Sequence, residues 1–248
     1  MKLCVEDKIF EVLIVRRGPL LEKAQLLRGE VFLGKGQKDH DQYDRSCEHV
    51  VVVDQGTGAV VGTYRLLLSS VAWKEKGDKG FYAETEFDLK NIRKNCRGEL
   101  LEMGRACVDP DYRKYPVINF MWKAITTFVR ERKVKFIFGC ASIDQPDPEK
   151  VGKIYSFLKE RVYSPPRLRV FPRKDKGFPC QKDPLMRSQR EALRLMPSLV
   201  KGYLTVGAYI CGEPVWDRDF NTADFFMMID TAKMNTSFLE KFFYAKGA

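Results

Sequence analysis

Apolar residues in the first third of the chain follow two different spacings. Residues 10–15, FEVLIV, form a short apolar run that is typical of a strand. Residues 19–32 begin with a proline and predict a helix. The apolar side chains at helical spacing are Leu20, Leu21, Ala24, Leu27 and Val31. Two valine-rich runs, residues 49–54 and 59–68, are joined by a glycine-containing turn, which predicts an antiparallel hairpin.

The middle of the chain alternates between strand-like and helix-like patterns. Residues 99–108, ELLEMGRACV, predict a strand, and residues 115–132 predict a helix with a proline near its start. The apolar face of this helix consists of Ile118, Met121, Trp122, Ile125 and Phe128. Residues 135–142 predict a short strand that is buried on both faces, and residues 147–161 predict another helix. Strand, helix and strand in this order predict a parallel crossover pair in a mixed sheet.

The last third of the chain contains a basic segment followed by apolar, β-rich sequence. Residues 163–182 are rich in proline and basic side chains, and we expect an exposed excursion there. Residues 203–217 and 222–230 are expected to return to the sheet. Because no internal repeat is present, residues 1–248 are predicted to form one α/β domain of the α+β kind, with helices flanking a central sheet.

Composition indicates a globular protein with a sizeable core, since 44% of its residues are hydrophobic and 12% are aromatic. The apolar runs are far shorter than the ~20 residues that a membrane-spanning helix needs. Charged residues interrupt the N-terminal region at Glu6, Asp7, Lys8 and Glu11, which argues against a secretory signal. We therefore expect a cytoplasmic protein.

Cysteine and histidine restrict the chemistry that the chain can perform. The seven cysteines are widely spaced, with no Cys-x-x-Cys pair and no Cys/His cluster, so we expect neither a disulfide framework nor a metal site. The two histidines, His40 and His49, are not flanked by a nucleophile signature such as G-x-S-x-G, which argues against a His-based triad. No bound nucleotide is expected, because the glycine-containing segments lack the order of a phosphate-binding loop.

The net charge of +10 favours an anionic partner. Charge alone leaves three classes open: nucleic acid, an anionic membrane surface and an acidic protein. A nucleic-acid-binding protein is the less favoured alternative, because the basic residues are dispersed among acids and no nucleic-acid-binding signature is present. An amphipathic segment at residues 237–248 is the candidate for peripheral contact with the inner face of the cytoplasmic membrane.

An acid and a base interrupt the strand predicted at residues 99–108. Glu102 and Arg105 would point to opposite faces of a regular strand, unless a bulge brings both to one side. Burial of either side chain without a partner would be strongly unfavourable. The two residues are therefore either core charges with partners elsewhere in the fold or members of a reaction cleft.

Three more motifs precede this pair in the chain. Arg28 and Phe32 form Arg-x-x-x-Phe, Asp41 and Asp44 form Asp-x-x-Asp, and Arg65 lies in Gly-Thr-x-Arg-Leu-Leu. Together with Glu-x-x-Arg, and in this order, they resemble the set shared by acyl-homoserine-lactone synthases and their relatives. In the second half, ETEFDL, LEMGRACVDPDYR, FGCAS and residues 199–230 are similar to bacterial ornithine N-acyltransferases and to hemolysin-like and N-acyl amino acid synthases. The resemblance thus spans nearly the whole chain.

The resemblance implies a GNAT-like fold with a mostly antiparallel sheet. It also implies an enzyme of lyso-ornithine lipid synthesis, which moves a long, often 3-hydroxylated, acyl chain from acyl carrier protein to the α-amine of an amino acid, with ornithine as the expected acceptor. The donor arrives on 4′-phosphopantetheine, and the chain itself is expected to bind no cofactor. An acyl-homoserine-lactone synthase is the alternative within this group. The lack of a tryptophan soon after Phe32 favours the amino acid branch, as do Cys107 and Val108, where homoserine-lactone synthases tend to have an aromatic residue.

Amide formation from a thioester needs a base, a stabilised oxyanion and a protonated thiol. Because histidine is scarce, Glu102 is the candidate base, acting directly or through water, with Arg105 as the other catalytic candidate. Backbone N–H groups at residues 105–108 would receive the oxyanion, and Tyr112 or Tyr115 would lie near the thiol. The resemblance assigns substrate binding to Arg28, Phe32, Asp41, Asp44, Arg65, Cys107 and Val108. Ion pairing that only braces the structure is the alternative for the charged members of this set.

The turn DPDYRKYPV, at residues 109–117, lacks the glycines with which GNAT acetyltransferases hold the pyrophosphate of acetyl-CoA. A carrier-protein arm ends in a single phosphodiester and needs less of a cradle. We therefore expect Tyr112, Arg113 and Lys114 to contact the phosphopantetheine phosphate or the acidic surface of the carrier protein. An ordinary solvated basic turn is the alternative.

Overall fold

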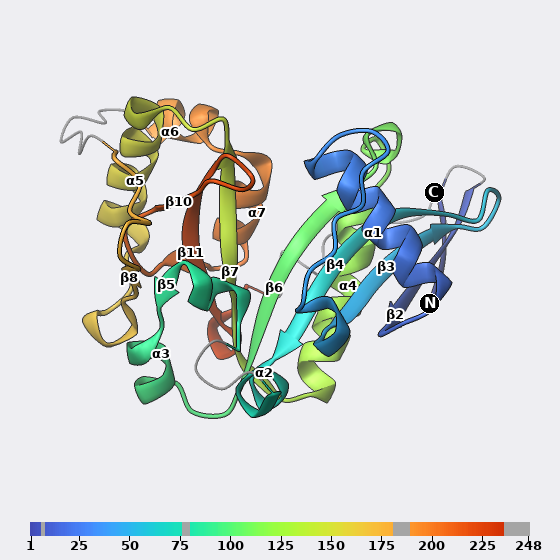
Figure 1. Ribbon diagram of the computed structural model, residues 1–248, viewed down its shortest axis with the longest axis horizontal. Helices are drawn as coiled ribbons and strands as arrows, with labels where there is room; N and C mark the ends of the chain where they lie inside the picture. Colours follow the sequence, from blue (N-terminus) through green and yellow to red (C-terminus); the bar gives the residue numbers. More distant parts are fainter. Residues whose placement is uncertain (6–7, 76–79, 181–188, 236–248) are drawn as a thin grey trace.

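Nine strands form the central sheet of the computed structural model, which describes residues 1–5, 8–75, 80–180 and 189–235 (Figure 1). Across the sheet they are β1 (Lys2–Val5), β2 (Lys8–Val15), β3 (Glu48–Asp54), β4 (Ala59–Leu68), β6 (Glu99–Val108), β7 (Val134–Asp144), β11 (Thr222–Asp230) and β10 (Val215–Asp217), with β9 (Tyr209–Ile210) paired to β11. Neighbouring strands are antiparallel except β6 and β7, which are parallel. The predicted mixed, mostly antiparallel sheet and its parallel crossover pair are therefore confirmed.

Helices cover both faces of this sheet. On one face, α1 (Pro19–Phe32) packs on β3 and β4, the short α2 (Ser69–Glu75) covers the ends of β4 and β6, and α3 (Lys90–Asn95) packs on the 3₁₀ turn η5 (Pro166–Leu168). On the opposite face lie α4 (Val117–Glu131), α5 (Pro148–Val162) and α7 (Ser198–Thr205), and α6 (Gln189–Leu195) packs on α5.

The valine run of β3 shows why a strand forms between these two layers. Val51 and Val53 contact the cluster under α1, whereas Val50 and Val52 belong to the cluster under α4. Because side chains alternate along a strand, a continuous apolar run is needed wherever both faces are buried. The predicted hairpin of β3 and β4 is confirmed in this central position, and α1 begins at Pro19 as predicted.

Residues 163–182 are less exposed than their sequence predicts. Leu168, Val170 and Phe178 are buried, and β8 (Phe171–Pro172) pairs with β5 (Phe87–Asp88) in a separate two-stranded sheet. The prediction of an exposed excursion is wrong at these positions, because apolar side chains alternate with the prolines and arginines and join the core clusters. Residues 181 and 182 lie outside the described part of the chain.

Two further differences concern the ends of the sheet. The strand β1 was not expected from the sequence, and it pairs with β2 from Lys2 opposite Glu11 to Val5 opposite Lys8. Residues 203–205, expected to be β-structure, instead form the last turn of α7, which is followed by Gly207 in the left-handed conformation at φ 94°. The candidate membrane segment at residues 237–248 lies outside the described residues. None of the described helices is long and apolar enough to cross a membrane.

Candidate active site

The strands β6 and β7 pair only over their first halves and then separate. Their parallel pairing runs from Glu99 opposite Val134 to Glu102 opposite Phe138. Beyond this point β6 remains paired with β4 as far as Val108, and β7 remains paired with β11 as far as Asp144. Residues 103–108 therefore have an edge that faces β7 without a strand partner, and the two strands diverge visibly in Figure 1.

A glycine allows the two strands to approach closely at the point where they begin to diverge. A Cβ atom on Gly139 of β7 would lie 2.2 Å from the carbonyl oxygen of Met103 on β6. Any side chain at this position would force the two backbones apart. Gly139 thus fixes the point at which the sheet opens.

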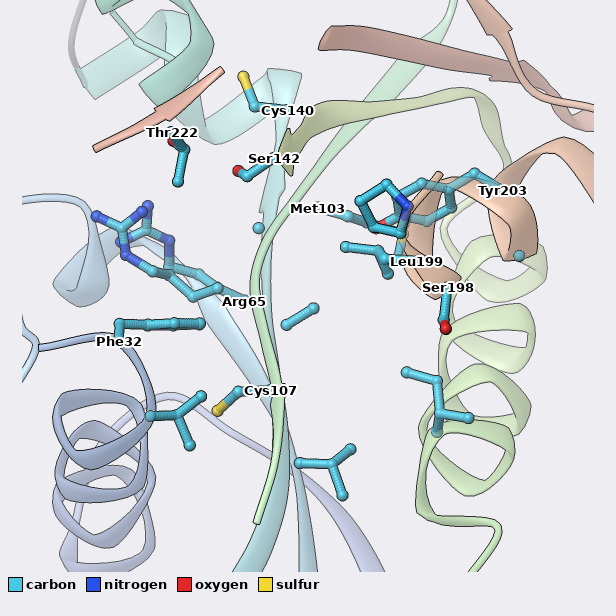
Figure 2. Close-up of a pocket in the computed structure, with 18 of the residues that line it drawn as sticks. Phe32, Arg65, Met103, Cys107, Cys140, Ser142, Ser198, Leu199, Tyr203 and Thr222 are labelled. Carbon is cyan, nitrogen blue, oxygen red and sulfur yellow. The ribbon is translucent and has the colours of Figure 1, made fainter. Parts of the chain in front are cut away.

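A cavity of about 1170 Å³ occupies the opening between the two strands. Figure 2 shows its wall on both sides of β6, with Phe32, Arg65 and Cys107 on one side and Leu199 and Tyr203 on the other. The first side carries the guanidinium of Arg65. The second side is bounded by α4 and α7 and is mainly apolar, with Ile118, Trp122, Leu199, Tyr203 and Val206. A ligand that threads the opening can therefore reach both faces of the sheet.

A β-bulge brings Glu102 and Arg105 to the same cavity. Tyr64 of β4 lies opposite two residues of β6, because Arg65 pairs with Gly104 while Thr63 pairs with Cys107. Arg105 adopts the left-handed conformation at φ 51°, which is uncommon for a residue with a side chain. Both Glu102 and Arg105 line the cavity, so the bulged alternative considered for this strand is the one observed.

Glu102 is a buried carboxyl group with two backbone donors. Its oxygens accept hydrogen bonds from the N–H groups of Tyr82, at 2.9 Å, and Ala83, at 2.7 Å. Burial raises the pKa of Glu102, and these hydrogen bonds oppose the shift, leaving a pKa of about 7. A carboxyl group with a pKa near neutrality is suited to accept a proton from an ammonium group in the same cavity.

Arg28 and Arg65 bind one aspartate from two sides. Arg28 donates to both carboxylate oxygens of Asp44 and, through Nε, to Asp39 at 2.7 Å. Arg65 donates through Nη1 to Asp44 at 3.1 Å and to Asp41 at 2.7 Å. Burial alone would raise the pKa of Asp44, but the hydrogen bonds and charges of Arg28 and Arg65 hold that pKa well below its usual range. These contacts fix the loop at residues 39–46 to α1 and β4, with the Asp44 carboxylate ionised.

Arg105 connects this network to the cavity. Its guanidinium contacts Asp39 at 3.1 Å and Asp41 at 3.4 Å, and it lies over the rings of Tyr82 and Phe220, at 4.7 and 4.6 Å from their centroids. A guanidinium between two aromatic rings is held by cation–π attraction as well as by its ion pairs. Arg105 is therefore a fixed positive charge in the cavity wall.

The predicted substrate-binding residues divide into two groups. Phe32, Arg65, Cys107 and Val108 line the cavity. The other group is not part of the described lining and consists of Arg28, Asp41 and Asp44. The ion pairing considered as their alternative role is observed, and direct contact of these three residues with a substrate stays a prediction.

The residues predicted to contact the acyl donor lie in different places. Arg113 lines the cavity, whereas Lys114 lies over the ring of Tyr115, with Nζ 5.2 Å from its centroid. Tyr112 points elsewhere, because it ends the short 3₁₀ turn η4 (Pro110–Tyr112) and its hydroxyl donates to Asp54 at 2.8 Å. Of the two tyrosines considered for the thiol, Tyr115 is the one in the cavity wall.

Sequence reasoning missed several residues of the site. Asp39 binds both Arg28 and Arg105, and Tyr82 covers Glu102 while its hydroxyl donates to Asp217 at 2.8 Å. The cavity wall also contains Cys140, Ser142, Asp217, Phe220 and Asp224. The sequence does contain a signal for Asp39. Residues 39–44, DHDQYD, include three aspartates, and Asp39 lies two residues before Asp41.

Comparisons with known proteins agree with this geometry. The family described as an Acetyltransferase (GNAT) domain matches residues 28–123. An N-acyl amino acid synthase from uncultured soil microbes has a similar structure, with a TM-score of 0.54 at 10% identity over 91% of this chain and 92% of that one. This likeness confirms the GNAT-like fold.

Curated relatives extend over almost the full length. The L-ornithine N(alpha)-acyltransferase of Rhodobacter capsulatus is 33% identical, over 96% of this chain and 95% of its own. The enzyme of the same name from Brucella abortus is 30% identical, over 92% of this chain and 87% of its own. The resemblance found in the motifs is confirmed by these matches. The chain belongs to the L-ornithine N(alpha)-acyltransferase family, a family of amide-forming acyltransferases.

Proposed function

We propose that the protein transfers an acyl chain from the phosphopantetheine thioester of acyl carrier protein to the α-amine of ornithine. The observation that carries this proposal is the opening between β6 and β7, in which a buried carboxyl group, Glu102, faces a cavity that reaches both sides of the sheet. A thioester arm and an amine can meet in such an opening from opposite faces.

The donor is assigned to the side of the cavity bounded by α4 and α7. Trp122, Leu199 and Val206 form an apolar wall there, which suits an acyl tail because burial contributes about 0.8 kcal/mol for each methylene group. Arg113 lies in the turn before α4 and lines the same cavity, where it is available to a phosphodiester. The net charge of +10 favours approach of an acidic carrier protein.

The acceptor is assigned to the side that contains Glu102, Arg65 and Arg105. Glu102 takes one proton from the α-ammonium group, directly or through water, and the neutral amine attacks the thioester carbonyl. The new C–N bond forms while negative charge gathers on the carbonyl oxygen, which the β7-facing N–H groups of residues 103–108 can receive. The C–S bond then breaks, and the departing thiolate takes the second proton from the nitrogen, leaving an amide and a free thiol.

The proposal is tested with purified protein, L-ornithine and either acyl carrier protein or coenzyme A carrying the same long acyl chain. We expect N-acyl-ornithine by mass spectrometry and a higher kcat/KM with the carrier protein. An equal or higher kcat/KM with coenzyme A would overturn the choice of donor while leaving the acyl transfer in place. Absence of any acyl-amino acid with either donor, together with salt-dependent binding to DNA or RNA, would overturn the proposed function.

A matched experiment in cells identifies the acceptor. Expression in a bacterium that lacks ornithine lipids is expected to produce a new acyl-ornithine in the lipid extract. The Glu102→Gln variant, expressed at the same level, is expected not to produce it. A new acyl-amide with a different amino acid would contradict ornithine as the acceptor.

A further inference from the structure

Three carboxyl groups gather at the cavity, with Asp217 and Asp224 in its wall and Glu86 beside them. Glu86 follows the 3₁₀ turn η3 (Tyr82–Thr85), Asp217 ends β10, and Asp224 lies on β11. They are 1%, 4% and 3% exposed, respectively. No lysine, arginine or histidine of the described residues forms an ion pair with any of them, and the charge of Arg105 acts on Asp224 only from beyond ion-pair distance. Burial of carboxylates in this way is unfavourable unless a positive charge or several donors compensate.

The donors around this acidic cluster (Glu86, Asp217 and Asp224) are incomplete. Asp217 accepts from the Tyr82 hydroxyl at 2.8 Å and from two backbone N–H groups, and Asp224 accepts from the Thr222 hydroxyl at 2.6 Å and from the Ser142 hydroxyl, so all these donors are neutral. Glu86 shares a side-chain hydrogen bond with Asp217 and accepts another from the Cys140 thiol at 3.2 Å. Two carboxyl groups can share a hydrogen bond only if one of them is protonated, so the pair lacks a positively charged donor.

The geometry of the cluster leaves a common point for a cation. A carboxylate oxygen of Glu86, a carboxylate oxygen of Asp224 and the Cys140 sulfur lie within 4.8 Å of one another. Asp217, Asp224 and Cys140 line the cavity, so this point is reached from the site of acyl transfer. Burial and the charge of Asp224 raise the pKa of Glu86, so the cluster favours a bound proton as long as no cation is present.

Tyr82 relates the cluster to Glu102. Its backbone N–H binds the Glu102 carboxylate, and its hydroxyl binds Asp217, so that one tyrosine spans the two sites. An amino acid whose side chain carries three methylene groups and an amine can span a similar length, with its α-amine at Glu102 and its terminal ammonium at the cluster. Arg105, which lies over the Tyr82 ring, is placed for the carboxylate of the same molecule.

We infer that the acidic cluster is the subsite for the side-chain ammonium group of the acceptor, so that Glu86, Asp217 and Asp224 make the enzyme selective for diamino acids. This inference rests on the proposed function. The inference adds to the proposed function by naming the residues that distinguish ornithine from a neutral amino acid of the same shape. An ammonium group offers three N–H donors and a positive charge, and no ion pair of the described residues supplies that charge to the cluster.

The test compares L-ornithine with L-norvaline, which has the same carbon chain and no terminal amine. For the wild-type protein we expect kcat/KM for ornithine to exceed that for norvaline by roughly 30-fold or more, as for other buried, hydrogen-bonded charge pairs. In Asp224→Asn we expect kcat/KM for ornithine to fall by roughly the same factor and kcat/KM for norvaline to change little. Asp219→Asn removes the same charge from an exposed position in the adjacent turn and is expected to preserve the selectivity.

Several outcomes would overturn the inference. Equal use of ornithine and norvaline by the wild-type protein would do so, as would an equal loss of both activities in Asp224→Asn. If that variant does not fold, calorimetric titration of the wild-type protein decides, because ornithine must bind more tightly than norvaline. Loss of ornithine selectivity with a chelator and its recovery with Zn²⁺ would assign the cluster to a metal ion instead. Failure to acylate any amino acid would reject the proposed function itself, and the inference with it.

Discussion

The Arg28 guanidinium, none of which is exposed, donates to both carboxylate oxygens of Asp44, at 3.1 and 2.9 Å. Arg65 shares one of these oxygens, so a single aspartate joins α1 to the central hairpin. This contact supports the side of the cavity that we assign to the acceptor, because Arg65 and Phe32, the last residue of α1, both line it.

Replacement of Asp44 by alanine should be strongly destabilising. Arg28 would keep Asp39 as a partner, but its buried charge would lose the bidentate contact. We expect the free energy of unfolding to fall by about 3–5 kcal/mol, as when other buried ion pairs lose one partner. Denaturant unfolding measures this value. Glu160→Ala removes an exposed partner of Arg161 and should change it by less than about 1 kcal/mol, and similar losses in both variants would contradict a structural role for the network.

Replacement of Glu102 by glutamine should remove the general base while keeping an acceptor for the covering turn. We expect kcat to fall by roughly 10²- to 10⁴-fold. Since the carboxylate form must accept the proton, wild-type kcat/KM should rise with pH through about 7 and lose this dependence in the variant. Glu99→Gln is the matched control, because Glu99 lies on the same strand and accepts from Ser69 and Ser70. A pH profile that is unchanged in Glu102→Gln would reject the assignment.

The same carboxyl group gives a stability prediction with a defined sign. Its pKa is higher in the folded protein, about 7, than its ordinary value of 4.5. The folded state therefore holds the proton more tightly, and stability is lost as pH rises from about 4.5 to about 7. Relative to the wild type, Glu102→Gln should gain roughly 3 kcal/mol over this interval. Urea unfolding of both proteins at several pH values measures the difference, and a constant difference would contradict the burial argument.

The sequence predicted the elements better than it predicted their contacts. The bounds of α1, β4, β6 and β11 follow from apolar periodicity, proline and glycine, which act within a few residues. The side of the strand to which Arg105 points depends instead on a left-handed conformation at a residue other than glycine, for which no local signal exists. Only the possibility of a bulge could be stated in advance.

Long-range partners account for the rest of what was missed. Resemblance identified Asp41 and Asp44, but the choice between Asp39 and its neighbours as partners of Arg28 depends on the path of the loop across the sheet. The acidic cluster joins Glu86 to the hairpin of β10 and β11 in a distant part of the chain, so neither spacing nor composition could bring Glu86 and Asp224 together. Residues 203–205 show the opposite error, in which β-like local sequence is overridden by packing of α7 on the core.

Gly139 provides a test of the point at which the strands separate. Gly139→Ala would place a methyl group 2.2 Å from the Met103 carbonyl oxygen, and a backbone atom cannot rotate away as a side chain can. We expect a loss of about 1–3 kcal/mol, the usual cost of overpacking. Gly104→Ala, one residue from Met103 on β6, meets no atom within 4 Å and should change stability by less than about 0.5 kcal/mol. Equal thermal unfolding of the two variants would show that the strands are not in close contact there.

Leu199 tests the assignment of the acyl tail to the side of the cavity bounded by α4 and α7. It lies in the apolar wall near Tyr203 in Figure 2, so Leu199→Trp would fill space that the end of a long acyl chain needs. Each methylene group that is no longer buried should lower kcat/KM by about fourfold, whereas donors short enough to end before residue 199 should be unaffected.

The preference of Leu199→Trp should therefore shift from long-chain to medium-chain donors, which a competition assay with mixed acyl carrier protein thioesters and mass spectrometry of the products can measure. Leu193→Trp adds the same bulk at an exposed position on α6, outside the described lining, and should leave the chain-length distribution unchanged. A uniform loss for all donors in Leu199→Trp would indicate that the helix had moved and would not support the assignment. An unchanged distribution would place the tail elsewhere in the opening, because a tryptophan that does not contact the tail cannot discriminate between chain lengths.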